Sequence, residues 1–118
     1  MPAPLVTIYA ADDYDTEVRR AADVIRGGGI VVLPTETVYG AAAALTSEPA
    51  RQRLRARWTS SEPRPFVPHL ANRDDARQFV GDDLGETARR LMRKLWPGPV
   101  GLIFDVPEAL RLDVAGSL

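Results

Sequence analysis

Residues able to bind a polar ligand gather at Thr35, Glu36, Thr37 and Tyr39, directly after the apolar run Ile30 to Leu33. A short uninterrupted apolar run is typical of a strand buried on both faces. Open α/β sheets bind their ligands just beyond the carboxyl ends of such strands. The three hydroxyls and one carboxylate therefore indicate a ligand site at the end of this strand. A turn that caps the next helix explains the same residues equally well.

The chain before this run predicts the elements that position it. A helix is expected over residues 16–26, begun by Asp13 or Asp15 and ended by the glycine run 27–29. A short first strand is expected from Leu5 to Tyr9. The apolar residues of the helix recur at helical spacing and face the sheet, and they are Val18, Ala21, Ala22 and Ile25.

The chain after the run predicts further elements. Ser47 caps a helix that continues to about Arg57, with Pro49 in its first turn. Residues 66–70 form a strand that lies at a sheet edge or is broken, because Pro68 lacks a backbone donor. Helices are expected over 74–80 and 84–95, the second with Leu84, Ala88, Leu91 and Leu95 on one side, and a strand over 100–106. The expected buried residues include Val18, Ile25, Val31, Leu33, Leu91, Leu95 and Ile103.

Length and composition favour one α/β domain spanning residues 1–118. The chain is 45% hydrophobic and 26% charged, and it has no apolar run near the ~20 residues that span a bilayer. We therefore expect a cytoplasmic protein with no membrane partner. The absence of cysteine excludes disulfides, thiol nucleophiles and thiolate metal sites, and no metal site is predicted.

Basic and acidic residues are segregated although the formal net charge is only −1. One basic group lies within residues 51–64 and a second within residues 89–94. The first group consists of Arg51, Arg53, Arg55, Arg57 and Arg64. Such a group forms either a face for nucleotide or RNA phosphates or the solvated side of a helix, and the sequence leaves both interpretations open.

The run from Gly28 to Gly40, GGIVVLPTETVYG, resembles the opening signature of the YrdC/Sua5/YciO family, the threonylcarbamoyl-AMP synthases of tRNA modification. The WPGP at residues 96–99 and the histidine at position 69 also match family motifs. The resemblance implies an α/β fold, a YrdC-like twisted mixed sheet with flanking helices, incomplete relative to the full family fold. It further implies that Thr35, Thr37 and Tyr39 line the pocket for L-threonine and nucleotide, with His69 near the amino acid.

Two departures bear on the implied catalysis. The family's K-x-R-P motif, whose cations hold ATP phosphates, falls on Trp58 and Ser60 in ungapped register, so both cations are missing. Arg57 and Arg64 are the local replacements. The part of the family domain that carries the S-x-N nucleotide motif is absent, which leaves a sheet edge open to a homo-dimer through residues 66–70 or 100–106 or to a partner chain.

Three hypotheses follow from the resemblance. The first is a catalytically impaired YrdC-like domain that binds tRNA or double-stranded RNA. The second is an active or split synthase, completed by a partner, that uses L-threonine, bicarbonate, ATP and Mg²⁺. The third is a non-catalytic regulatory or small-ligand-binding paralogue without a cofactor.

Overall fold

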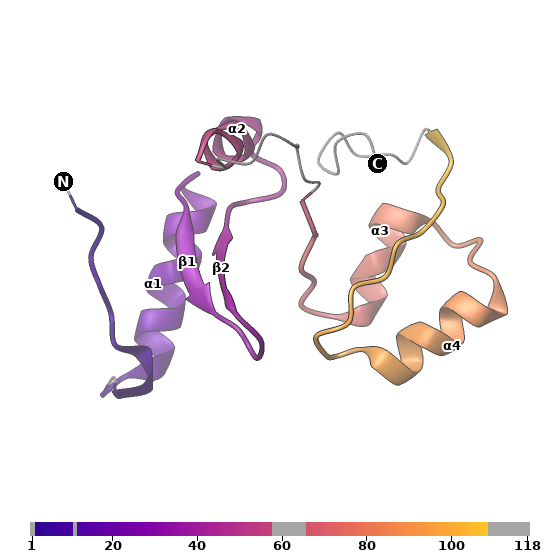
Figure 1. The fold of residues 1–118 in the computed structure, drawn as a ribbon, viewed down its shortest axis with the longest axis horizontal. Helices are drawn as coiled ribbons and strands as arrows, with labels where there is room; N and C mark the ends of the chain where they lie inside the picture. Colours follow the sequence, from indigo (N-terminus) through magenta and orange to yellow (C-terminus); the bar gives the residue numbers. More distant parts are fainter. Residues whose placement is uncertain (1, 11, 58–65, 109–118) are drawn as a thin grey trace. The chain divides into compact units, whose positions relative to one another are not determined.

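The computed structural model describes residues 2–10, 12–57 and 66–108 (Figure 1). The chain separates into an N-terminal unit, Met1–Thr59, and a C-terminal unit, Ser60–Leu118. Each unit is described by itself below. Helices and paired strands occur in the same chain, which confirms the predicted α/β class.

Helix α1 (Tyr14–Arg26) begins and ends as local side-chain chemistry predicts. The carboxylate of Asp13 accepts hydrogen bonds from the Thr16 amide at 3.0 Å and from the Thr16 hydroxyl at 2.5 Å. These bonds, the hydroxyl first, hold the pKa of Asp13 below its ordinary value. Gly27 ends the helix, and Gly28 has a φ of 83°, a conformation that favours glycine. The glycine run is therefore a helix end and turn, as predicted.

One side of α1 packs beside β1 (Val31–Pro34), as Figure 1 shows. Ala21, Ala22 and Ile25 are half-buried, but Val18 is 46% exposed, so its predicted burial is wrong. The 13-residue helix is about 20 Å long, whereas a four-residue strand extends about 13 Å. The strand is therefore too short to cover the first turns of the helix.

Strand β1 pairs with β2 (Tyr39–Ala42) in an antiparallel hairpin, with Val31 opposite Ala42 and Leu33 opposite Gly40. The prediction of a strand at 30–33 is confirmed, although β2 was missed. Val31 and Leu33 are half-buried, but Val32 is 66% exposed. The hairpin is covered on one face only, so the expectation of a central strand buried on both faces is wrong for the described residues. Their sheet is this antiparallel pair rather than a mixed sheet.

The N-terminal segment before α1 is not a strand. Residues 2–7 have no regular structure, and a 3₁₀ turn, Ile8–Ala10, follows them. Leu5 is 95% exposed. A strand needs a neighbour to pair with, and the sheet among the described residues consists of two strands later in the chain, 31–34 and 39–42. The predicted strand from Leu5 to Tyr9 is therefore wrong.

Helix α2 (Glu48–Ala56) confirms the predicted cap and first turn. The hydroxyl oxygen of Ser47 accepts a hydrogen bond from the Ala50 amide at 3.3 Å, and Pro49 lies in the first turn, where a missing N–H costs nothing. Ala50 is fully buried. The Ser47 cap and the burial of Ala50 therefore hold the first turn of α2 in place within the N-terminal unit.

The C-terminal unit contains a 3₁₀ turn, Arg73–Ala76, then α3 (Arg77–Val80) and α4 (Glu86–Leu95). The two predicted helices are confirmed in position, the first as a 3₁₀ turn continued by one α-helical turn. In α4 the buried residue is Met92, 7% exposed, whereas Leu91 is 42% exposed, so its predicted burial is wrong. Both residues stand at helical spacing from Ala88 and Leu95, so only packing decides which one is covered.

Residues 66–70 and 99–107 contain no strand, so the strand predicted over 100–106 is wrong. The strand predicted over 66–70, at a sheet edge or broken, does not form either, since Pro68 lacks a backbone donor and these residues pair with no strand among the described residues. Side chains of 101–107 still alternate in exposure, with Leu102 half-buried and Ile103 84% exposed, which also corrects the predicted burial of Ile103. The Trp96 indole N–H donates to the Val100 carbonyl at 2.6 Å. This bond joins the end of α4 to the start of the extended segment.

Candidate functional site

The loop between β1 and β2 is organised around the hydroxyl of Thr35. The amides of Thr37 and Val38 donate to this oxygen at 3.3 and 3.1 Å, and the hydroxyl itself donates to the Val38 carbonyl. The Thr35 amide also donates to the Val38 carbonyl, at 3.2 Å. These contacts close the loop on itself.

Thr35 therefore has no hydrogen-bonding capacity left for a ligand. A hydroxyl group has one donor and two acceptor positions, and four groups of the loop share them here: the Val38 carbonyl, the Thr37 and Val38 amides and the Thr37 hydroxyl. The resemblance implied that Thr35 lines the ligand pocket. In this conformation its side chain shapes the loop instead. Sequence reasoning missed this role, although threonine is known to bond to the backbone two or three residues onward in turns.

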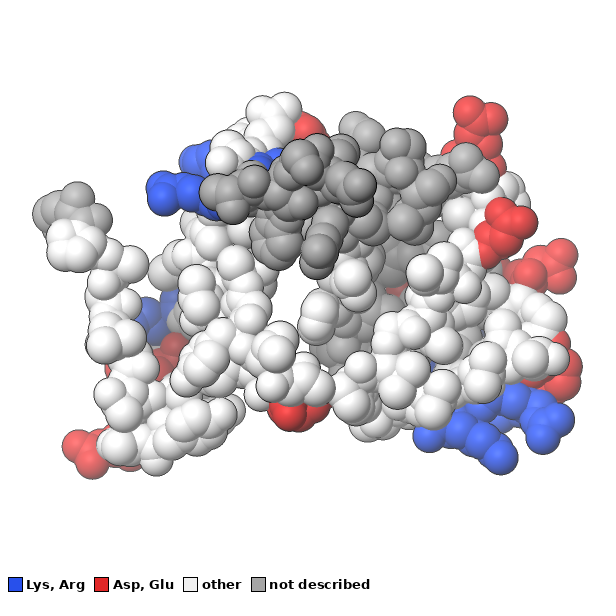
Figure 2. Space-filling model, viewed as in Figure 1, with Lys and Arg blue, Asp and Glu red and all other residues white. Residues whose placement is uncertain are grey.

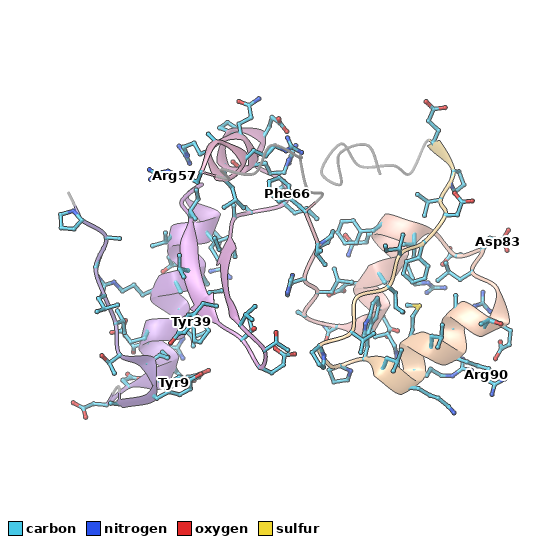
Figure 3. All side chains as sticks on the ribbon, viewed as in Figure 1. Tyr9, Tyr39, Arg57, Phe66, Asp83 and Arg90 are labelled. Atoms are coloured by element: carbon cyan, nitrogen blue, oxygen red, sulfur yellow. The ribbon has the colours of Figure 1, made fainter. Side chains whose placement is uncertain are left out.

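Thr37 and Tyr39 keep polar groups available to a ligand. The Thr37 hydroxyl has one contact, to the Thr35 hydroxyl at 3.3 Å, and Tyr39 is 72% exposed (Figure 3). The side chain of Glu36 is also exposed. The loop is thus an open polar surface rather than an enclosed pocket. Two open hollows among the described residues lie elsewhere, one beside α1 and one at the glycine turn.

His69 belongs to the C-terminal unit and is exposed there. Its Nδ1 lies 3.0 Å from the Val67 carbonyl oxygen. Because a carbonyl only accepts, this hydrogen bond needs the proton on Nδ1, which leaves Nε2 as an acceptor for a neutral ring. Thr35, Thr37 and Tyr39 belong to the N-terminal unit.

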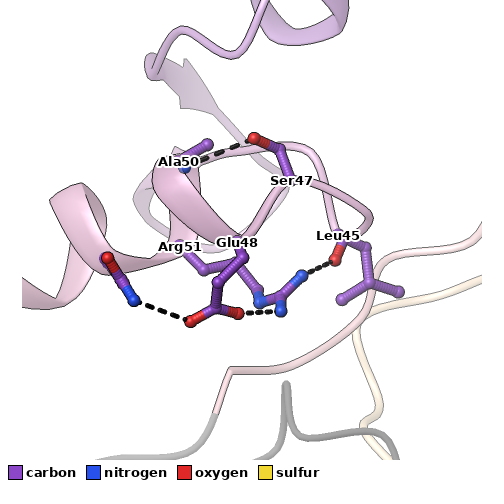
Figure 4. A network of polar contacts seen from close by, with 6 residues as sticks. Leu45, Ser47, Glu48, Ala50 and Arg51 are labelled. Atoms are coloured by element: carbon purple, nitrogen blue, oxygen red, sulfur yellow. Dashed lines mark hydrogen bonds and ion pairs between the residues drawn. The ribbon is translucent and has the colours of Figure 1, made fainter.

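Arg51 makes its contacts within the N-terminal unit (Figure 4). Its guanidinium donates to the Leu45 carbonyl and to the Glu48 carboxylate, and its side chain is only 12% exposed. The other Glu48 oxygen accepts a hydrogen bond from the side-chain amide of Gln52 at 3.1 Å. Arg51 is therefore committed to its own unit, which corrects its predicted place in an outward phosphate-binding face. The i, i+3 spacing of Glu48 and Arg51 was the signal for this ion pair.

The remaining arginines of α2 differ in their contacts. Arg53 is exposed, and its guanidinium donates to the Gly28 carbonyl across the unit. Arg55 is exposed and has an interaction of its own. Arg57 is exposed at the end of the helix (Figure 3). Figure 2 shows basic side chains beside α2 in one unit and beside α4 in the other. Two of the α2 arginines, Arg53 and Arg57, line one hollow.

The two positions at which the family cations are expected, Trp58 and Ser60, lie outside the described residues, as does Arg64. Within the described ranges no group of three or more His, Asp or Glu side chains is arranged to hold a metal ion. None of the helices in those ranges is both long enough and apolar enough to cross a membrane.

Comparison with known proteins gives a consistent result. The model of the Sua5/YciO/YrdC family, described as telomere recombination, matches residues 23–117. The threonylcarbamoyl-AMP synthase of Pyrococcus abyssi is 31% identical over 86% of this chain and 30% of its own length. The Bacillus subtilis protein of the same name is 30% identical over 88% of this chain and 30% of its own length. The human one is 32% identical over 84% of this chain and 35% of its own length.

No solved structure matches the chain. The chain spans about a third of the length of these curated relatives, so their activity is not transferred by similarity alone. The family match nevertheless extends over most of the sequence, including the hairpin, α2 and α4. The chain belongs to the Sua5/YciO/YrdC family.

Proposed function

We propose that this chain is a YrdC-like domain related to the threonylcarbamoyl-AMP synthases, and that it lacks synthase activity on its own. The observation that carries the proposal is the pair of residues at the K-x-R positions. In the ungapped register that the resemblance implies, Trp58 and Ser60 stand where the family motif has Lys and Arg. Synthesis of threonylcarbamoyl-AMP from L-threonine, bicarbonate and ATP requires positive groups that offset the charge of ATP and of the departing pyrophosphate, usually with Mg²⁺.

The β1–β2 loop supports retained recognition of a small ligand. Thr37 and Tyr39 present a hydroxyl and a phenol on an open surface, and Thr35 holds the loop closed beneath them. These groups suit the carboxylate and hydroxyl of L-threonine. His69, which the family resemblance assigns to the amino acid, offers an acceptor at Nε2 when its ring is neutral.

Calorimetric titration separates ligand recognition from turnover. L-threonine, ATP with Mg²⁺, and the two together are each titrated into the 118-residue chain. The proposal expects weak binding of L-threonine that is lost in Thr37→Val, and no saturable binding of ATP. Tight ATP binding that strengthens with L-threonine would instead support an active synthase. Binding of neither ligand would favour the regulatory paralogue.

RNA binding is the second candidate function, and a specific observation favours it. Arg53, Arg55 and Arg57 are exposed along α2, although Arg51 is not available. Contacts of such side chains with tRNA or double-stranded RNA are sequence-blind and weaken with salt. Between 50 and 200 mM salt, affinity for a duplex RNA should fall about 40-fold if three phosphates are contacted. Equal affinity at both salt concentrations would refute this candidate.

Association with a second chain is the remaining part of the proposal. The alternating exposure of residues 101–107 is that of a strand, yet no neighbouring strand in the described residues pairs with it. An unpaired extended segment is a site for strand pairing. A second copy or a partner that completes a split synthase would pair here. Light scattering that shows only monomer at high micromolar concentration would exclude pairing with a second copy. A partner protein would then be the chain to test.

A further inference from the structure

A second candidate binding site lies at the other end of β1. The open hollow there, which we call the glycine-turn hollow, has a volume of about 460 Å³. It is lined by Gly27, Gly28, Gly29, Ile30, Arg53, Ala56 and Arg57. Thr35 follows Gly29 by six residue steps of extended chain, a distance of about 20 Å. The hollow is therefore separate from the polar loop that follows β1.

The described residues that line this hollow carry only positive charge. Among them are two arginines and no carboxylate, in a chain whose formal net charge is −1. The carbonyl end of α2 carries a partial negative charge, and the two guanidinium groups around the last turn outweigh it. An anion is the ligand that such a surface attracts.

The backbone leaves room for the anion to approach. Three of the lining residues are consecutive glycines, and Gly28 has a φ of 83°. The Arg53 guanidinium donates to the Gly28 carbonyl, which holds this exposed side chain against the turn, and a guanidinium has further N–H donors for a ligand. Among the described residues Arg57 has no hydrogen bond or ion pair through its side chain. One cation is thus held in place and one is available.

We propose that the glycine-turn hollow binds a phosphate group through Arg53 and Arg57. Guanidinium groups bind phosphate with two parallel hydrogen bonds each, which makes phosphate the best-matched anion. The phosphate comes either from the backbone of an RNA or from a small phosphorylated molecule. Only the first source rests on the RNA-binding function proposed above.

The test uses the backbone amides of the glycine turn as local reporters. The ¹⁵N-labelled chain is titrated at low salt with inorganic pyrophosphate and, separately, with a short duplex RNA. Pyrophosphate should shift the amide signals of Gly27 to Ile30. The change Arg57→Gln should weaken this binding about two- to five-fold, the usual loss for one exposed charge pair. Arg90→Gln is the matched control, since it removes an exposed arginine of α4 and should leave the affinity unchanged.

The RNA titration distinguishes the two sources of phosphate. Shifts of the same glycine amides by RNA would support an RNA backbone as the ligand. A response to pyrophosphate alone would support the phosphate site and remove the RNA function. Binding of RNA with no change at Gly27 to Ile30 would overturn the site and leave the RNA function intact. Equal pyrophosphate affinity in Arg57→Gln and Arg90→Gln would also overturn it.

Discussion

Replacement of Thr35 by valine tests whether its hydroxyl holds the β1–β2 loop. Valine has nearly the same shape, so the change removes the hydroxyl and little else. The Thr37 and Val38 amides lose their shared acceptor, and the Val38 carbonyl loses one donor. Each intramolecular hydrogen bond contributes about 0.5–1.5 kcal/mol net, and water reaches this exposed loop, so the total loss should be about 1–2 kcal/mol.

Urea unfolding followed by circular dichroism measures this loss, with Thr35→Ser and Thr37→Val as controls. Serine keeps the hydroxyl and should retain most of the stability. Thr37→Val removes a single 3.3 Å contact and should cost less than Thr35→Val. L-threonine affinity should fall in Thr35→Val because the loop opens. It should also fall in Thr37→Val because the hydroxyl proposed to contact L-threonine is removed. Unchanged stability of Thr35→Val, or an equal loss in Thr35→Ser, would refute the role assigned to the hydroxyl.

Three further predictions concern the stability of the chain. In urea unfolding, Met92→Ala should lower the free energy of unfolding by about 2 kcal/mol or more because Met92 is buried. Leu91→Ala should lower it by less than about 1 kcal/mol because Leu91 is exposed. The reverse order would contradict the packing of α4. Arg51→Met should cost about 1–3 kcal/mol through its lost contacts, whereas Arg90→Met should stay within about 0.5 kcal/mol. The lowered pKa of Asp13 means that its stabilising effect is present above the ordinary pKa of 3.8 and lost as pH falls through the lower folded value. The stability of Asp13→Ala should accordingly change less than that of the parent chain between pH 5 and 2, and parallel curves would refute the assignment.

Elements fixed by local chemistry were predictable from the sequence. Asp13 and Ser47 cap their helices because their side-chain oxygens reach amides three residues onward. The glycine run ends α1 because Gly28 adopts a positive φ. These signals lie within a few residues of the structure they specify, so one sequence is enough to interpret them.

Features that depend on distant packing were not predictable in the same way. Val32 and Ile103 are apolar and stand in strand-like runs, yet both are exposed because no other element in the described residues covers them. Strand β2 was missed because its small residues, Gly40 to Ala42, have weak strand preference and pair only because the loop returns them to β1. The role of Arg51 likewise depends on the Leu45 carbonyl, which only the folded chain brings near.

The candidate site was predicted in composition but not in geometry. The sequence identified Thr35, Thr37 and Tyr39 as neighbours after a strand, and the structure places all three in or beside one loop. It did not indicate that Thr35 is fully occupied by the loop itself. The number of hydrogen bonds that one oxygen makes depends on backbone geometry, which residue types alone do not specify.

Release of pyrophosphate from ATP in the presence of L-threonine, bicarbonate and Mg²⁺ tests the central claim most directly. The assay uses the purified 118-residue chain, with a full-length family member as positive control. Loss of one transition-state donor typically lowers the rate by ~10²–10³, and two cations are replaced here, so the chain alone should release no pyrophosphate above background. The double change Trp58→Lys with Ser60→Arg should restore some nucleotide affinity without full turnover. Robust release by the unmodified chain would contradict the claim and would require Arg57 or Arg64 to take the place of the missing cations.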